Sequence, residues 1–252
     1  MPSLAARVLL NLSFALSGPA HPERSLDLYL ASQPQPTPLL VYVHGGAWIS
    51  GDKSEAASIA RFFQNRGWSV AVLNYRLATE TAHRHPEPVN DLRDALKWLV
   101  KRAPQDGFRA DRFVVLGHSA GAWLMAFEAS RSPHPEVRGW IGVEGIYDLK
   151  SLAKRWPAYP EWFLNRAFGP SSQEWPEWRT LRSTVPWLVV HSNEDELVDR
   201  GQSETFVEHL RKQKVPAEMR RLEAGSHFGV LDRLVQPGSE SAGLLKWMEA
   251  LP

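Results

Sequence analysis

The segment 113–121, Phe-Val-Val-Leu-Gly-His-Ser-Ala-Gly, constrains the fold of this chain of 252 residues more than any other stretch. Its first four residues are apolar and include two valines, which is typical of a strand buried on both faces of a parallel sheet. The pattern from Ala122 to Ser130 predicts a helix, so the turn between them carries Ser119 at its apex. Glycines two residues before and after the serine remove side chains that would clash in so sharp a turn. The hydroxyl would stand at a helix N-terminus, which favours a developing negative charge; an ordinary strand-to-helix loop is the alternative.

Strands and helices alternate along most of the chain, and this order predicts an α/β fold with a mostly parallel central sheet and helices on both faces. In such sheets, sites form at the carboxyl ends of the strands. The expected strands are Arg7–Leu16, Ser25–Leu30, Leu39–Val43, Trp68–Tyr75, Phe113–Leu116, Val137–Ile146, Trp187–Val190 and Ala217–Leu222. The expected helices are Lys53–Arg66 after an N-cap at Asp52, Pro86–Arg102, Ala122–Ser130, Gly201–Lys212 and Gly238–Ala250.

The alternation lapses between Tyr147 and Val185, where prolines and aromatic residues are frequent. We interpret residues 149–185 as a short helical cap inserted into a single domain that spans residues 1–252. Its aromatic side chains either line a pocket for a flat apolar group or pack the cap onto the body of the protein. These residues are Trp156, Tyr159, Trp162, Phe163, Phe168, Trp175 and Trp178.

Composition excludes several classes of function. The chain has no cysteine, which rules out disulfides, a cysteine nucleophile and thiolate metal sites, and which fits a reducing compartment such as the cytoplasm. A net charge of +1 argues against nucleic-acid or membrane-surface binding driven by bulk electrostatics. No segment approaches the ~18 consecutive apolar residues of a membrane span. Residues 1–20 faintly resemble a secretory signal, but Arg7–Leu16 suits an opening strand better.

A serine nucleophile needs a base, and the base needs an acid to orient it. In hydrolase sheets of this kind the order along the chain is serine, acid, histidine. His227 follows the last expected strand in a loop with small neighbours, and we assign it as the base. The other histidines after Ser119 lie between prolines, at a strand end before the expected acid, or inside a helix; they are His134, His191 and His209.

The acid is expected in the loop that follows the strand ending at Val190. Four carboxylates occur there: Glu194, Asp195, Glu196 and Asp199. Asp195 lies far enough past the strand to turn toward a histidine, and we assign it as the acid. Asp199 suits a cap of the helix that follows.

The third requirement is a set of backbone amides that stabilise the oxyanion of a tetrahedral intermediate. One donor is expected from Ala120, directly after the serine. The others are expected from Gly45, Gly46 and Ala47, in the loop that follows the strand ending at Val43. Metal chemistry has weaker support, because His83 and His85 lie in a proline-bounded loop with no third ligand, and we expect no metal site.

With these residues placed, the chain resembles the α/β-hydrolase superfamily, and Asn74-Tyr-Arg-Leu77 is similar to a strand-end motif of its esterase branch. That branch usually has an acidic residue where this chain has His118, and H-G-G-G where this chain has His44-Gly-Gly-Ala-Trp48. The H-G-G-x-W form is similar to that of kynurenine formamidases (arylformamidases). Further stretches resemble the fungal type: Glu144–Leu152, Tyr159-Pro-Glu, Arg166-Ala-Phe168 and His191–Leu197.

The resemblance implies hydrolysis of N-formyl-L-kynurenine to L-kynurenine and formate, in tryptophan catabolism, with no cofactor. The partner it implies is therefore a small aryl formamide. Substrate contacts are expected from His44, Trp48, Tyr147 and Trp162, with the aromatic cap near the aryl ring and Trp48 on the acyl side.

Other functions stay open at this stage. A carboxylesterase for short acyl or aryl esters would use the same residues, and a peptidase would too, although no extra domain restricts access to peptides. A ligand-binding protein on a decayed hydrolase fold would have lost a member of the triad. The oligomeric state is open between a monomer and a homodimer.

Overall fold

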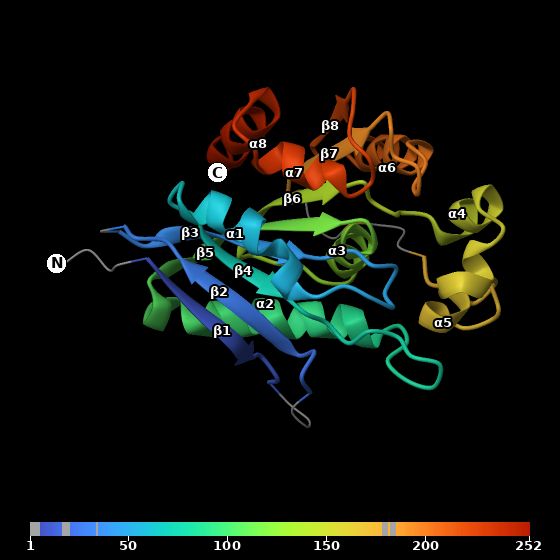
Figure 1. Cartoon of the computed structure of the whole chain (residues 1–252), viewed down its shortest axis with the longest axis horizontal. Helices are drawn as coiled ribbons and strands as arrows, with labels where there is room; N and C mark the ends of the chain where they lie inside the picture. The colour runs from blue at the N-terminus through green and yellow to red at the C-terminus, as the bar shows by residue number, and fades with distance from the viewer. Residues whose placement is uncertain (1–5, 17–20, 34, 178–180, 182–184) are drawn as a thin grey trace.

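The computed structural model describes residues 6–16, 21–33, 35–177, 181 and 185–252, and its centre is an eight-stranded sheet (Figure 1). The strands follow the order β1-β2-β4-β3-β5-β6-β7-β8. The pairs β1–β2 and β2–β4 are antiparallel, and the pairs from β4–β3 through β7–β8 are parallel. The expected α/β fold with a mostly parallel sheet is therefore confirmed.

The strands are β1 Arg7–Ser13, β2 Ser25–Leu30, β3 Thr37–Val43, β4 Ser69–Leu73, β5 Phe108–His118, β6 Val137–Val143, β7 Trp187–Ser192 and β8 Ala217–Leu222. The α-helices are α1 Ala57–Gln64, α2 Glu87–Asp106, α3 Ala120–Arg131, α4 Leu149–Arg155, α5 Asn165–Phe168, α6 Gly201–Lys212, α7 Gly229–Val235 and α8 Ser239–Glu249. Two short helical turns complete the order, η1 Lys53–Ala56 (3₁₀) and η2 Pro160–Leu164 (π).

The inner strands β2, β3, β4, β6 and β7 are buried on both faces, and successive residues of a strand point to opposite sides. In β5, Phe113 and Val115 belong to one core while Val114 and Leu116 belong to the other. The first core is covered by α2, α3 and α6, and the second by α1, α7 and α8 (Figure 1). A continuous apolar run is therefore the right composition for these central strands.

Most expected elements are present within a few residues of their expected bounds. The opening strand is confirmed as β1, and the Asp52 side chain caps η1 by accepting from the Ser54 amide at 2.8 Å. Helix α7 was not expected, because it is short and follows the loop of His227 directly. None of the described helices combines the length and apolar character needed to span a bilayer.

The segment interpreted as a cap lies at the carboxyl ends of the parallel strands, where Figure 1 shows α4 and α5 beyond the end of the sheet. Its aromatic residues Phe163 and Phe168 pack against Trp48, with ring centroids 6.1 and 4.8 Å away. These two side chains therefore join the cap to the body. Trp178 and the end of the expected cap, residues 182–184, lie outside the described residues.

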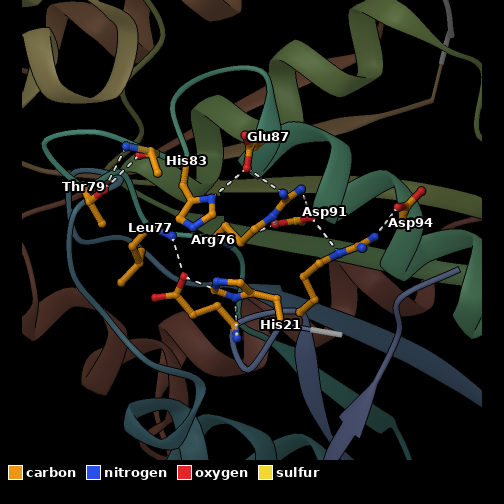
Figure 2. Close-up of polar contacts among 11 residues, drawn as sticks. His21, Arg76, Leu77, Thr79, His83, Glu87, Asp91 and Asp94 are labelled. Atoms are coloured by element: carbon orange, nitrogen blue, oxygen red, sulfur yellow. Dashed lines mark hydrogen bonds and ion pairs between the residues drawn. The ribbon is translucent and has the colours of Figure 1, made fainter. Parts of the chain in front are cut away.

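An ion-pair cluster fixes the loop after β4 to the N-terminal part of α2 (Figure 2). Asp91 is fully buried and accepts from Arg76 Nε at 2.9 Å and Arg76 Nη2 at 2.8 Å. Arg76 also pairs with Glu87, and Arg24 pairs with both Asp91 and Asp94. Because these ion pairs anchor the loop at Arg76, the preceding residues Asn74 and Tyr75 are held in place near the site described below.

Gly121→Ala is expected to destabilise the protein by about 1–3 kcal/mol, because a Cβ there would lie 2.3 Å from the Val43 carbonyl oxygen. Chemical denaturation followed by tryptophan fluorescence measures the loss. Gly243→Ala in α8 is the matched control: its Cβ would meet the flexible end of Arg220 at 3.1 Å, and alanine favours a helix by roughly 0.5–1 kcal/mol. Equal unfolding midpoints for the two variants would contradict the tight packing at Gly121.

Candidate active site

Ser119 lies between β5 and α3 with φ 53° and ψ −115°, a conformation that costs a residue with a side chain about 1–3 kcal/mol. A Cβ on Gly117 would lie 2.6 Å from the carbonyl carbon of Gly121, and Gly121 itself lies against the end of β3. Both positions therefore require glycine. The Ser119 amide donates to Val143 O at 2.9 Å, which ties the turn to β6. The expected sharp turn is present.

His227 and Asp195 come from the loops after β8 and β7, and the structure brings them into contact. His227 Nδ1 lies 3.0 and 2.9 Å from the two carboxylate oxygens of Asp195. Asp195 Oδ1 also accepts from the amides of Leu197 and Val198, each at 2.9 Å. Burial opposes the charge on Asp195, but the hydrogen bond from His227 and the other donors outweigh it and hold the pKa of Asp195 below its ordinary range.

The His118 ring connects the histidine loop to the serine turn. His118 Nε2 lies 2.8 Å from the backbone oxygen of His227, and because a carbonyl can only accept, Nε2 is the donor. The centroids of the His118 and His227 rings are 4.8 Å apart. Burial and the nearby His227 lower the pKa of His118 to about 3, so the ring is neutral. Among the described residues the Ser119 hydroxyl has no hydrogen-bond partner, and no bond joins it to His227. Such bonds often tighten only when substrate binds.

The loop after β3 brings free amides toward Ser119. Gly46, Ala47 and Trp48 have φ of 96°, 53° and 61°, which turns the backbone sharply. A Cβ on Gly45 would lie 3.0 Å from Ser119 Cβ, so the loop packs directly on the serine turn. In the part of the chain that the structure describes, the amides of Gly46 and Ala47 have no acceptor. The Ala120 amide belongs to the first turn of α3, where amides lack an intrahelical partner.

Residues of the esterase-like Asn74–Leu77 motif brace this loop. The Tyr75 hydroxyl donates to Gly45 O at 3.0 Å, and its ring stacks on His44 at 4.4 Å. Asn74 accepts from the Lys53 amide at 2.6 Å and donates to Asp52 at 2.7 Å. The loop that offers the amides is therefore fixed before any substrate arrives.

The four residues expected to contact substrate have different surroundings. His44 is buried beneath the loop, and Trp48 is 1% exposed in a cluster with Trp123 and the cap residues. Tyr147 is buried and stacks on Phe206 at 3.9 Å, whereas Trp162 is 56% exposed on the cap. These positions make Trp48 and Tyr147 packing residues in this state, and substrate contact by any of the four stays a prediction.

Two cavities lie near the carboxyl edge of the sheet. One of about 410 Å³ borders the amide-bearing loop and includes His44, Gly46, His118 and Phe228 in its lining. The other, of about 260 Å³, is bordered by Tyr147, Trp175 and residues of α4 and α6. The first is the closer to Ser119, because Gly45 and His118 line it.

The remaining candidates for acid and base have other partners. His134 bonds to Glu128 and Glu136, which overcome the opposing effect of burial and raise the pKa of His134 to about 9. Glu194 and Glu196 accept from the amides of Gly225 and His227 at 2.9 and 3.0 Å, so they brace the histidine loop. The expectation that Asp199 caps α6 was wrong: the N-cap is Arg200, because Asp199 lies one residue too early, and no side chain of the described residues caps the helix. His209 lies in α6.

Two buried residues beside Asp195, Glu144 and His191, had no expected role in the site. Glu144 directly follows β6, and its Oε2 lies 3.2 Å from His191 Nε2, which in turn lies 3.5 Å from Asp195 Oδ2. One polar atom from each of the three side chains lies within 4.8 Å of the others. His191 Nε2 faces the Val198 backbone oxygen and Asp195 accepts from His227, so we assign none of the three as a metal ligand. The signal available in the sequence was a glutamate at the end of a buried strand.

Comparison with known proteins places the chain among hydrolases. A BD-FAE family model matches residues 26–149. The kynurenine formamidase of Eremothecium gossypii is 32% identical over 218 residues, which cover 76% of this chain and 86% of that protein. Kynurenine formamidase avaC of Aspergillus versicolor is 30% identical over 236 residues, covering 75% of this chain and 81% of avaC. Esterase LipC of Mycobacterium tuberculosis is 29% identical over 70% of this chain, which spans about half of LipC (49%).

Solved structures with a similar fold include several esterases. A truncated carbohydrate esterase from gut microbiota superposes with a TM-score of 0.82 at 15% identity, covering 99% of this chain and 97% of that one. A hyperthermophilic esterase from Pyrobaculum calidifontis superposes with a TM-score of 0.78 at 21% identity, covering 98% and 86%. At these identities the likeness concerns the fold, and it confirms the expected α/β-hydrolase fold.

His118→Asn is expected to change how stability depends on pH. Because the pKa of His118 is lowered to about 3 from an ordinary 6.5, the unfolded chain takes up a proton below pH 6.5 that the folded chain refuses. The wild type therefore loses about 2–3 kcal/mol more than His118→Asn between about pH 7.5 and pH 4.5. Denaturant unfolding at both pH values measures the difference, with the partly exposed His21→Asn as the control. Identical losses in His118→Asn and the wild type would contradict a neutral His118.

Proposed function

Because this chain belongs to the α/β-hydrolase family of the kynurenine formamidases, we propose that it hydrolyses N-formyl-L-kynurenine to L-kynurenine and formate. At the coarser level, the chain is a hydrolase of the esterase and formamidase type. The observation that carries a serine mechanism is the His227–Asp195 pair beside the strained turn of Ser119.

In the proposed mechanism Ser119 is the nucleophile and His227 is its base. Asp195 accepts from His227 Nδ1, so Nε2 is the nitrogen left to take the serine proton. The Ser119 oxygen attacks the formyl carbon as its proton passes to Nε2. The tetrahedral intermediate carries its negative charge on the former carbonyl oxygen.

The free amides of Gly46, Ala47 and Ala120 are the proposed donors to this oxyanion, and Gly45 provides the close approach to Ser119. When the intermediate collapses, the C–N bond breaks and protonated His227 gives its proton to the departing aryl amine. A formyl ester remains on Ser119. Water, deprotonated by His227, then attacks this ester and releases formate, which restores the serine. These steps use side chains and amides of this chain alone.

Support for a formamidase comes from the relatives of Aspergillus versicolor and Eremothecium gossypii and from the H-G-G-x-W loop. The chain covers 81% and 86% of the length of these two relatives, against 49% of LipC. The aromatic cap residues Phe163 and Phe168 lie against this loop at Trp48, so a planar aryl group has apolar surroundings close by. The second candidate, a carboxylesterase, is favoured by the similarity to LipC and by the esterase structures.

Ser119→Ala is expected to lower kcat/KM on N-formyl-L-kynurenine by about 10⁴-fold or more, because the nucleophile is lost while binding is kept. Asp195→Asn should cost about 10⁴-fold, since the amide favours the wrong tautomer of His227. Kynurenine absorbance follows the reaction directly. Ser226→Ala, in the same loop as His227 but with its hydroxyl on the Gly229 amide, is the control and should stay within a few-fold of the wild type. Undiminished hydrolysis by Ser119→Ala would refute the mechanism.

The substrate itself is tested by comparing kcat/KM on N-formyl-L-kynurenine with that on p-nitrophenyl acetate. A formamidase is expected to favour the formamide by about tenfold or more in kcat/KM, equivalent to an activation free energy lower by ~1.4 kcal/mol. Because esters are chemically easier to cleave than amides, a preference for the formamide has to come from the enzyme. A preference for the ester would favour the carboxylesterase over the formamidase.

A further inference from the structure

Behind the proposed triad lies a buried group of three titratable side chains, Glu144, His191 and Asp195. The exposed fractions of the side chains are 0%, 0% and 1%. Glu144 is held in a left-handed conformation, φ 48°, and its amide donates to Val190 O at 3.0 Å. The triad mechanism assigns no role to Glu144 or His191. A buried carboxyl beside a second carboxyl needs a physical account, because two like charges in an apolar site repel strongly.

The hydrogen bonds of His191 determine where its proton lies. His191 Nε2 is 3.1 Å from the backbone oxygen of Val198, which can only accept, so Nε2 carries a hydrogen. His191 Nδ1 is 2.8 Å from the Ser203 hydroxyl, which can donate to it. Burial, the largest influence, lowers the pKa of His191 and favours this neutral ring. The single N–H of His191 is thus directed to Val198 and does not neutralise the carboxylates.

The two carboxyls differ in the donors that face them. Asp195 accepts hydrogen bonds from His227 Nδ1 and from the amides of Leu197 and Val198. Within the part of the chain that the structure describes, Glu144 accepts one hydrogen bond, from the Ser192 amide to Oε1 at 2.9 Å. Among the described residues Glu144 Oε2 is buried without a donor, and a carboxyl oxygen of Glu144 lies within 4.8 Å of one of Asp195. A proton on Glu144 Oε2 turns this contact from a repulsion into a hydrogen bond.

We propose that Glu144 is a positioning residue that keeps a proton on Oε2 and donates a hydrogen bond to Asp195. This bond extends the triad to a Glu144–Asp195–His227–Ser119 relay. The proposal rests on the proposed function, because it acts through the triad. Burial, and next Asp195, raise the pKa of Glu144, which agrees with a neutral acid. The titratable groups around Glu144 are His191 and Asp195, which lie closest, and Glu196 and Tyr147 further away; His227 contacts Asp195. The neutral acid fixes Asp195 without adding a second charge behind His227.

Stability measured against pH tests the proton on this pair without using activity. The unfolded chain releases the proton of Glu144 above its ordinary pKa of 4.5, whereas the folded chain keeps it, so the wild type loses stability as the pH rises. Glu144→Gln has no proton to lose. The ratio of the unfolding constants, wild type over Glu144→Gln, is expected to grow about tenfold per pH unit between about pH 5.5 and 8.5. The exposed Glu208→Gln in α6 is the control and should give a constant ratio; a constant ratio for Glu144→Gln as well would overturn the proposal.

Carbon-13 NMR of carboxyl-labelled glutamate tests which carboxyl holds the proton. In the wild type at neutral pH, one glutamate signal should keep the chemical shift of a protonated carboxyl, and it should vanish in Glu144→Gln. If labelled aspartate gives the protonated signal instead, the proton lies on Asp195 and the proposed direction of the bond is wrong.

Activity tests the positioning role. Glu144→Gln keeps an acceptor for Ser192 and a donor for Asp195, so its kcat should stay within about twofold of the wild type. Glu144→Ala loses the donor, and its kcat should fall about tenfold or more with KM unchanged, the equivalent of one hydrogen bond to a charged group. Both variants place a residue other than glycine in the same left-handed conformation, so backbone strain does not distinguish them. Glu144→Gln therefore serves as the conservative rescue. Wild-type kcat in Glu144→Ala would overturn the role, whereas wild-type activity in Ser119→Ala would instead overturn the proposed function.

Discussion

The packing of Gly121 against the end of β3 is the constraint on which the rest of the site depends. A Cβ at this position would lie 2.3 Å from the Val43 carbonyl and 2.6 Å from that of His44, so α3 begins closer to β3 than any side chain permits. This approach bends the chain through the strained backbone of Ser119. It also brings Gly45 and the free amides that follow it against the same turn. The serine and the amides proposed to serve it are therefore products of one contact.

Charge determines the other side of the site. Asp195 is buried, yet three donors stabilise its ionised form, and this makes it a fixed acceptor for His227. Glu144 accepts from one donor and lies beside Asp195. The arrangement of lower free energy therefore has a single negative charge on the two carboxyls. Neutral His118 and His191 on either side add no positive charge. His227, the proposed base, therefore faces one fixed carboxylate.

The order of strands and helices was predictable from the sequence because the central strands are apolar on both faces and are separated by amphipathic helices. Ser119 and the contact between His227 and Asp195 were predictable too, since the carboxyl ends of parallel strands share one edge. Glu144 and His191 were not, because a buried polar residue at a strand end has the same sequence signal whether it is structural or part of a relay. The surroundings of Trp48 and Trp162 depend on how the cap docks, and no local pattern encodes that packing. Helix α7 is too short for its periodicity to stand out.

In the proposed site, His227 and Asp195 activate Ser119 as a nucleophile. Intact-mass and peptide-mapping mass spectrometry after treatment with a fluorophosphonate measures this activation, because the reagent labels an activated serine covalently. We expect a single adduct on Ser119 that forms quickly in the wild type and about a thousandfold or more slowly in His227→Ala. An adduct on another residue, or labelling of Ser119 at the same rate in His227→Ala, would contradict it.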